Sequence, residues 1–563
     1  MKSRENAAGV GILGILGILV LLPLAAVLFQ ILCPGLQLEK FDLKNLSLVL
    51  DVFVRPLWKK AFLNSFFLSS GTTAIGLVLA AILAHIRTRY QFAGAKLLDL
   101  TAWILMIMPS FLLAQGWVYF SSSNGIASAW LGIPGVGSFV FSYWGLVTVM
   151  VLCKFPMAYV TIKTSLEWYP ARLMYASRMN GASSFHAWRT IQLPLCIPAY
   201  CSAAMLIFMD TVGDYGMSST ITAVYSFPTL PYTIYSAICS SPARFDMAGV
   251  LSLYLMVMIV IAMAVQCGAM GKKKFDFLDN GTEQIQAVRP GKGLGAFLSI
   301  TVLSFCMIAL GIPVGSNLIM SFSDSVSIQK FAFTLDNYRQ VFSSASSMVS
   351  GIRHSLGLAG VSAVIGVLIG FCIAYVLTYS RFKLKKMIDM LTLVAMAVPG
   401  VVLGIGYIFI WNQKWLSSIG LHLYGKPSIL VLASVASAIP MINRVLVGGM
   451  AKIPESLLTA AQMQGAGFLT KIRTILLPLL HNSSVSAVLA AFGGSVFNLA
   501  ITTILYPPNY STLPVYISDS YNDLKFGYAA AATIVGGAFI IGIMLILEMM
   551  LNIGYLGKGK RRK

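Results

Sequence analysis

Long apolar runs alternate with short polar segments along the whole chain. About twelve of these runs reach the roughly 20 apolar residues that a membrane-spanning helix needs. Unpaired backbone groups are too costly in lipid, so each run is expected to be helical. The pattern therefore predicts an all-α polytopic membrane protein with spans at residues 9–33, 62–85, 98–121, 140–163, 195–220, 244–267, 295–320, 355–379, 388–411, 427–450, 480–505 and 527–553.

The first apolar run, residues 9–33, follows Lys2 and Arg4. It is longer than the apolar core of a signal peptide, which has about 7–15 residues. We expect the run to be retained as the first span, with the amino terminus in the cytoplasm.

Basic residues gather in the polar segments on one side of the predicted spans. Lys and Arg outnumber Asp and Glu by 40 to 19, which gives a formal net charge of +21. A basic excess in short loops follows the positive-inside rule and suits anionic lipid better than nucleic acid. Both termini are therefore expected to be cytoplasmic, together with the basic segments 87–96, 163–189, 272–292, 381–386, 452–473 and 558–563.

The most polar stretch of the chain is 271–292, which separates two similar halves. We expect a first half of six spans at 1–270, a cytoplasmic linker at 271–292 and a second half of six spans at 293–563. Residues recur between the halves at nearly constant offsets, which predicts two parallel repeats with a pathway at their interface. The pairs at offset 290 are Ile75 and Ile365, Gly76 and Gly366, Asp99 and Asp389, Pro109 and Pro399, and Gly116 and Gly406; those at offset 284 are Pro156 and Pro440, and Gly181 and Gly465.

One cytoplasmic loop carries the same motif in both halves. Between the predicted fourth and fifth spans, Tyr175-Ala176-Ser177 is followed by Gly181, Ile191 and Leu193-Pro194. The second half repeats this spacing with Thr459-Ala460-Ala461, Gly465, Ile475 and Leu477-Pro478.

This motif resembles the EAA loop of ABC-importer permeases, and the resemblance extends over nearly the whole chain. The chain departs from the family pattern at the Glu, which is Tyr175 in one copy and Thr459 in the other. The resemblance implies a fused, type I ABC importer-like permease in the bacterial cytoplasmic (inner) membrane. It also implies partners: two copies of an ABC ATPase subunit that bind ATP and Mg²⁺, and an extracytoplasmic substrate-binding protein.

In that family a short coupling helix in this loop fits a groove on the ATPase subunit. Small residues permit close contact, glycine permits a bend, and exposed apolar residues on a cytoplasmic loop favour docking. The alternative is that each loop only packs on its own bundle. The expected coupling-loop residues are Ala176, Ser177, Met179, Gly181, Ala182 and Phe185 in the first half, and Ala460, Ala461, Met463, Gly465, Ala466 and Phe468 in the second.

Ionisable residues inside spans are costly and therefore candidates for function. Asp210 and Asp214 lie four residues apart on one helix face, and Asn498 is aligned with Asp214. We expect a pathway role for these three residues, with helix capping or bracing as the alternative. Lys154 is expected to pair with an acid or to extend toward the interface. Asp99 and Asp389 are expected to cap helices.

Two further outer segments, 229–234 and 512–517, share the pattern T-L-P-x-x-I. They could contact a binding protein or simply pack as loops.

The remaining chemistry argues against an enzyme. The sequence has no G-x-x-x-x-G-K-[ST] motif for ATP phosphates, and neither its eight cysteines nor its five histidines form a metal-ligand pattern. We expect no cofactor on this chain itself. A secondary active transporter with two six-helix repeats is the alternative, and it would need no ATPase partner. The resemblance implies a small solute as substrate, namely ferric iron, aminoethylphosphonate, thiamine, a polyamine or a sugar phosphate, and the two carboxylates favour a cation.

Overall fold

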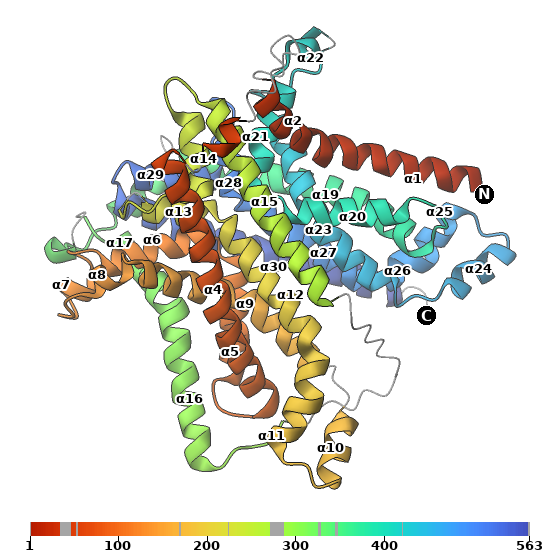
Figure 1. Ribbon diagram of the computed structural model, residues 1–563, viewed down its shortest axis with the longest axis horizontal. Coiled ribbons are helices and arrows are strands. Elements are labelled where there is room, and N and C mark those ends of the chain that lie inside the picture. Colours follow the sequence, from red (N-terminus) through yellow and green to blue (C-terminus); the bar gives the residue numbers. More distant parts are fainter. Residues whose placement is uncertain are drawn as a thin grey trace. The chain divides into compact units, whose positions relative to one another are not determined.

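The computed structural model describes nine stretches of the chain, and every named element in them is a helix (Figure 1). Most of the predicted linker lies outside the described residues, because 271–286 is not among them. The described stretches are residues 2–33, 47–51, 54–167, 171–222, 224–270, 287–324, 328–343, 347–418 and 420–560.

Within these stretches, nine helices are long and apolar enough to cross a membrane, and three bent helix pairs raise the number to as many as twelve. The predicted all-α polytopic fold is thereby confirmed. The nine are α1–α2 (Lys2–Leu32), α4 (Pro56–Arg89), α9 (Tyr143–Glu167), α11–α12 (Ser184–Val212), α15 (Phe245–Met270), α16–α17 (Lys292–Ser321), α19 (Ser347–Tyr379), α23 (Pro427–Met450) and α30 (Phe526–Lys560).

The third span of each half was predicted as one helix, 98–121 and 388–411, and is instead a bent pair. In the first half α5 (Ala95–Ile107) meets α6 (Ser110–Ser121) at a bend of 107°. In the second, α20 (Lys385–Ala397) and α21 (Gly400–Trp411) bend by the same 107°.

The aligned prolines Pro109 and Pro399 explain these bends. A proline disfavours helical geometry in the residue before it, and Met108 and Val398 have extended ψ angles of 128° and 118°. The next helix therefore starts in a new direction directly after each proline.

The predicted fifth spans, 195–220 and 480–505, were also too long. Helix α12 (Leu193–Val212) stops at Val212, and a new helix, α13 (Tyr215–Thr222), begins after Asp214. In the second half, Phe468–Leu479 and α27 (His481–Val496) are bent by 80°, and α28 (Leu499–Leu505) begins after Asn498.

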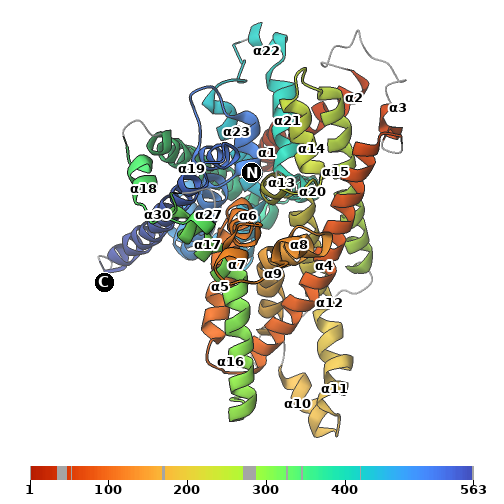
Figure 2. The same cartoon turned by 90° about the vertical axis from the view of Figure 1, so that its left-hand side faces the viewer.

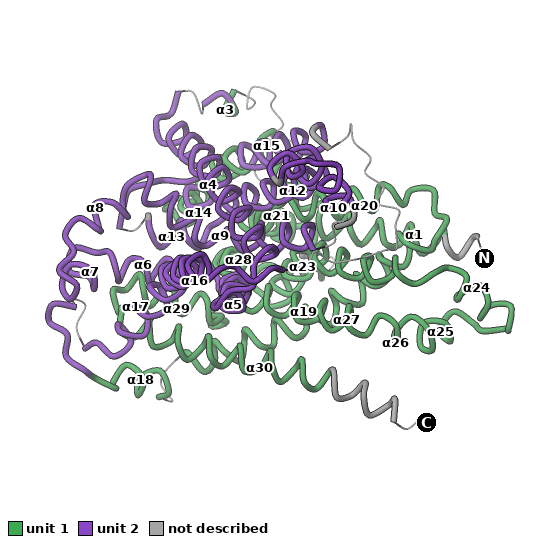
Figure 3. The backbone as a smooth tube through the Cα atoms, turned by 90° about the horizontal axis from the view of Figure 1, so that it is seen from below, with its two compact units in different colours: residues 1–49, 234–252, 334–563 green, residues 50–233, 253–333 purple. Residues whose placement is uncertain are grey.

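The chain divides into two compact units that cut across the sequence halves (Figure 3). Unit 1 comprises residues 1–49, 234–252 and 334–563, and unit 2 comprises residues 50–233 and 253–333. The first helix of each sequence half therefore belongs to the unit that holds most of the other half. The division at 1–270, 271–292 and 293–563 remains a prediction from sequence.

In each unit, a glycine lies against a proline of the exchanged first helix, that is, the first helix that comes from the other sequence half. In unit 2, a Cβ placed on Gly116 would lie 2.6 Å from the Cα of Pro313 on α17 (Ile312–Ser321). In unit 1, a Cβ on Gly406 would lie 2.8 Å from the carbonyl carbon of Pro23 on α2 (Leu22–Leu32). The repeated glycines that the sequence analysis singled out are therefore the sites where these helix backbones touch.

Pro23 and Pro313 are themselves 290 residues apart, and each follows a π-helical turn, at Gly17–Leu21 and Met307–Gly311. A proline leaves the carbonyl four residues earlier without its helical donor. In unit 1 the hydroxyl of Tyr407 donates to the carbonyl of Leu19, at 3.1 Å. The turn and the tyrosine together accommodate the proline in the apolar helix.

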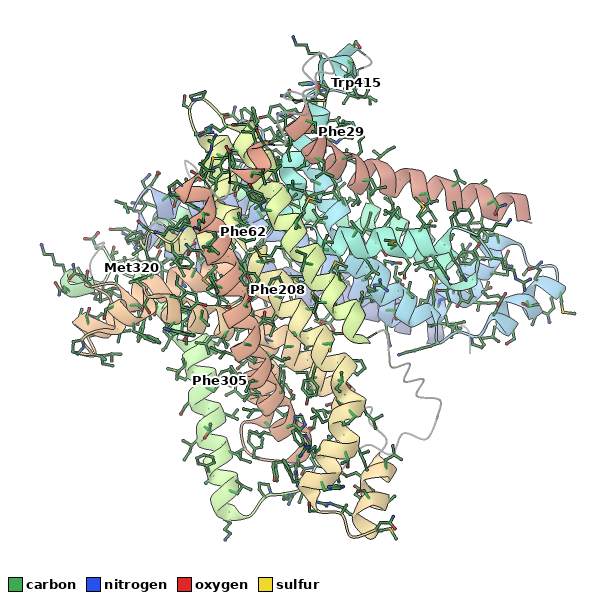
Figure 4. The ribbon with its side chains drawn as sticks, viewed as in Figure 1. Phe29, Phe62, Phe208, Phe305, Met320 and Trp415 are labelled. Atoms are coloured by element: carbon green, nitrogen blue, oxygen red, sulfur yellow. The ribbon has the colours of Figure 1, made fainter. Side chains whose placement is uncertain are left out.

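Each unit has a core of three helices. In unit 2, α4, α9 and α12 pack together, and in unit 1, α19, α23 and α27 do the same (Figure 2). Phe305 of α16 (Lys292–Cys306), labelled in Figure 4, meets Phe155 of α9 edge-on at 5.0 Å. The coupling-loop motifs follow α9 and α23 directly, so these cores position them.

Candidate functional site

The two predicted coupling loops have the same backbone geometry. The first contains α10 (Ala171–Met179), and the second contains α24 (Glu455–Met463). Each helix ends at a glycine, Gly181 or Gly465, with a φ of +82°. This left-handed conformation favours glycine, because an L side chain would crowd the backbone.

The hydrogen bonds around these glycines are also repeated. In the first loop, the Gly181 N–H donates to the Arg178 carbonyl and the Ala182 N–H to the Ser177 carbonyl. In the second, the Gly465 N–H donates to Gln462 and the Ala466 N–H to Ala461. Both loops therefore end their helix in a Schellman motif, which fixes the direction in which the chain turns back.

Beyond each glycine a short helix leads back into the fifth span, and Figure 1 shows α10–α11 and α24–α25 at the ends of their helical bundles. These are α11 (Ser184–Ala187) and α25 (Phe468–Lys471). Pro194 and Pro478 each follow a π-helical turn, at Trp188–Gln192 and Ile472–Leu476, in the same way as Pro23 and Pro313.

The tips of the two loops expose large apolar side chains. Met179 is 88% exposed and the aligned Met463 is 86% exposed. Phe185 and Phe468, predicted as docking residues, are also exposed. The residue aligned with Phe185 is Leu469, which is 78% exposed and was missed by the sequence analysis, although the offset of 284 identifies it.

An aromatic contact anchors each loop at the same position of its second span. In unit 2 the Trp188 indole donates to the Nε2 of His85 on α4, at 3.3 Å. In unit 1 Phe468 meets Tyr375 of α19 edge-on at 5.3 Å. His85 and Tyr375 are 290 residues apart, so the two loops contact aligned positions of the second span, although they do so through Trp188 and Phe468, which are not aligned with each other.

The candidate pathway residues of the first half form an ion-paired centre. The Lys154 ammonium of α9 lies 2.8 Å from an Asp210 carboxylate oxygen and 2.5 Å from one of Asp214. The Lys154 and Asp214 side chains are 9% and 3% exposed, whereas that of Asp210 is 35% exposed. One positive and two negative charges leave the centre with a formal net charge of −1.

Asp214 is occupied by structural contacts. It accepts the Met217 N–H at 2.7 Å and the Ser110 hydroxyl at 2.9 Å, in addition to the Lys154 contact. The aligned Asn498 accepts the Ile501 N–H at 3.0 Å. Both residues therefore start a new helix after the fifth span, and Asp210 keeps the more accessible carboxylate.

The prediction that Asp99 and Asp389 cap helices is wrong. Asp99 lies one turn inside α5, whose N-cap is Gly94, and Asp389 lies one turn inside α20, whose N-cap is Leu384. Asp99 accepts from neighbouring helices, and Asp389 pairs with Arg444 at 3.2 Å. An aspartate near a helix start was mistaken for a cap because its interhelical partners are distant in sequence.

The two T-L-P segments are each held by the same kind of hydrogen bond, to a serine of the second span. The Leu230 N–H donates to the Ser65 hydroxyl at 2.8 Å, and the Leu513 N–H donates to the Ser355 hydroxyl at 2.9 Å. Leu230 and Leu513 are fully buried. The starts of α14 (Leu230–Cys239) and α29 (Leu513–Asn522) are therefore packed on the second span, and contact of these segments with a binding protein stays a prediction.

Together these observations define a helical membrane permease whose two sequence halves repeat the same arrangement of helices and loops. No group of three or more His, Cys, Asp or Glu residues that could hold a metal ion occurs among the described residues. Residues 76–267 and 366–553, more than half of the chain, match the family described as binding-protein-dependent transport system inner membrane component.

The chain belongs to this family, and it is the membrane permease of an ABC importer. The family description places it in the inner membrane and implies a binding protein and an ATPase as partners. This function was predicted from the duplicated loop motif and is confirmed.

Relatives agree with this assignment. The chain is 22% identical over 499 residues to the ferric transport system permease protein FbpB of Actinobacillus pleuropneumoniae, a match that covers 87% of this chain and 70% of the relative. It is 23% identical over 454 residues to the putative ferric transport system permease protein FbpB 1 of Haemophilus influenzae, covering 79% of this chain and 70% of the relative. A shorter match, 28% identical, joins 33% of this chain to 82% of the molybdenum transport system permease protein ModB of Escherichia coli K12.

Proposed function

We propose that the two coupling loops each dock one copy of a separate ABC ATPase subunit, which binds ATP and Mg²⁺ and hydrolyses the nucleotide. This permease itself then needs no cofactor. Nucleotide-driven closure of the two ATPases moves the loops, and the helix bundles change between inward-open and outward-open packings. An extracytoplasmic binding protein delivers the solute to the outer side.

The observation that supports this proposal is the duplicated elbow. Both loops combine a glycine at φ +82° with a methionine that is more than four-fifths exposed at the loop tip. Exposed apolar side chains on a loop indicate a protein contact. Packing of each loop on its own bundle would not leave Met179 and Met463 outside.

A single substitution tests the docking. Gly465→Arg forces a side chain onto a left-handed backbone position in the loop, so we expect loss of ATPase co-purification and of transport. Gly425→Arg is a matched control, because Gly425 has a φ of +78° and lies just before α23, at the other end of that helix. Equal ATPase recovery with both variants would contradict the proposal.

The proposed orientation places both termini in the cytoplasm. Figure 3 shows the described parts of α1 and α30 running toward the same end of unit 1 as α24 and α25. If α24 faces the ATPase, both termini lie on that side. Protease digestion of tags at residues 1 and 563 in inverted membrane vesicles tests this orientation.

We further propose ferric iron, or another small cationic solute, as the transported substrate, with Asp210, Asp214 and Asn498 near its path. The support is twofold: two relatives are named as ferric transport permeases, and the Lys154 centre keeps a net negative charge with Asp210 accessible. An uncompensated carboxylate attracts cations.

Uptake of radioactive Fe³⁺ by proteoliposomes that contain the permease, the ATPase and the binding protein tests this assignment. We expect Asp210→Asn to reduce uptake about tenfold, corresponding to a loss of about 1.4 kcal/mol of interaction with the cation. Asp246→Asn is the control, because Asp246 is 44% exposed and pairs with Arg244. Full uptake with Asp210→Asn would remove this residue from the pathway.

A further inference from the structure

Asp99 is the centre of a polar cluster near the predicted cytoplasmic ends of three helices in unit 2. One carboxylate oxygen accepts from the Tyr159 hydroxyl at 2.7 Å and from the Lys163 ammonium at 2.8 Å. The other accepts from the Arg87 guanidinium at 2.8 Å. The side chains of Asp99, Lys163 and Arg87 are only 20–25% exposed, so solvent screens these pairs weakly.

The cluster joins separate spans immediately before the first coupling loop. Arg87 lies in the last turn of α4, Asp99 in the bent third span, and Tyr159 and Lys163 on α9. Lys163 is four residues from the end of α9 at Glu167, which is about 6 Å along a helix. A displacement of the loop therefore reaches this cluster within about one helical turn.

In the second half, other residues occupy the positions aligned with this cluster. The positions aligned with Arg87, Tyr159 and Lys163 are Leu377, Asn443 and Val447. Asp389 pairs with Arg444 at 3.2 Å, and both side chains are at least 40% exposed. The end of α23 is held instead by the Tyr379 hydroxyl, which donates to the carbonyls of Met450 and Ile453.

We propose that Asp99 is a positioning residue that fixes the inner end of α9 to the second and third spans. The fixed ends make the first coupling loop and the bent span α5–α6 move as one body. This inference rests on the proposed docking of an ATPase at that loop. In the first half, the motion of the ATPase is then transmitted through the ion pairs of Asp99. In the second half, it is transmitted through the hydrogen bonds of the Tyr379 hydroxyl to two backbone carbonyls.

The test is the number of solute molecules transported per ATP hydrolysed, in the complete transporter reconstituted in proteoliposomes. Asp99→Asn leaves Arg87 and Lys163 without their shared carboxylate, so we expect this ratio to fall about tenfold while hydrolysis continues, within the usual range of coupling between sites. Asp389→Asn is the matched control, and its ratio is expected to change less than about twofold, because exposed ion pairs contribute little.

Tyr159→Phe keeps both ion pairs and the ring, and removes only one hydrogen bond to Asp99. This variant serves if Asp99→Asn does not fold, and a reduction of the ratio by about threefold is expected. A parallel fall of hydrolysis and transport in these variants would mean that the cluster only holds the fold, and an unchanged ratio would equally overturn the inference. Failure of the docking proposal is a separate result, because the unaltered permease would then not co-purify with an ATPase.

Discussion

In the first half of the chain, the buried ammonium group of Lys154 on the fourth span pairs with Asp210 of the fifth span and with Asp214, which follows that span. The aligned positions in the second half are Ala438, Gly494 and Asn498, so no ion pair forms there. The inner end of the fourth span shows the same contrast between the Asp99 cluster and the Tyr379 hydroxyl. Two halves with the same elbows and the same bend in the third span are thus held by buried or half-buried ion pairs in one case, and by packing, neutral hydrogen bonds and the exposed Asp389–Arg444 pair in the other.

This comparison separates geometry from the chemistry that maintains it. The elbow glycines, the bend prolines and the glycine–proline contacts recur in both halves, because each meets a backbone requirement. The side-chain contacts between helices differ between the two halves, because many different pairs of side chains can fill the same space between two helices. Variants at aligned positions therefore report which features are equivalent.

Lys154→Met is expected to have the largest effect. It leaves Asp210 and Asp214 without their cation, and breaking a buried ion pair costs about 3–5 kcal/mol. The melting temperature of the detergent-solubilised permease, followed by size-exclusion chromatography, measures the loss. Ala438→Met places the same side chain at the aligned position and is expected to be tolerated; a comparable loss there would remove the contrast between the halves.

Gly116→Ala and Gly406→Ala are expected to destabilise the permease by similar amounts. Each introduces a Cβ within 3 Å of a proline on the exchanged first helix, and such overpacking costs about 1–3 kcal/mol. Thermal unfolding measures both. Gly315→Ala is the control, since no atom lies within 4 Å of a Cβ at that position. Clearly unequal losses would show that the two helix contacts are not equivalent.

The outer ends of the halves are expected to respond alike to removal of one hydroxyl group. Ser65→Ala and Ser355→Ala each deprive a buried backbone N–H, of Leu230 or Leu513, of its acceptor. A buried donor left unpaired costs about 1–3 kcal/mol, and here we expect the lower end of that range. Hydrogen exchange at the starts of α14 and α29 should increase in the corresponding variant. Unchanged exchange would show that the serine does not hold the segment.

The smallest effect is expected at the loop anchors. His85→Ala removes a long hydrogen bond to Trp188, and Tyr375→Ala removes an edge-on contact with Phe468. Each is worth about 0.5–1.5 kcal/mol. Limited proteolysis of the loops should become faster in both variants, whereas Phe120→Ala, which removes a ring that contacts Trp117 away from the loops, should leave it unchanged.

The sequence by itself determined the membrane fold, the duplication and the coupling-loop motif. Apolar runs, steady offsets and glycine–proline spacing are local properties, and they survive in any packing of the helices. The motif also identified the exposed apolar residues Met179, Phe185, Met463 and Phe468, although Leu469 needed the offset to be applied one residue further.

Only the tertiary structure decided which side chains meet. The exchange of the first helices, the pairing of Lys154 with both acids and the Asp99 cluster all join residues that are distant in sequence, 383 positions apart in the case of Pro23 and Gly406. The bends at Pro109 and Pro399 were not predicted, because a proline in an apolar run does not by itself indicate a bend. Pro156 and Pro440 lie inside unbroken helices. Whether a proline bends an apolar helix depends on the neighbours that receive the freed backbone groups, and those neighbours are set by packing.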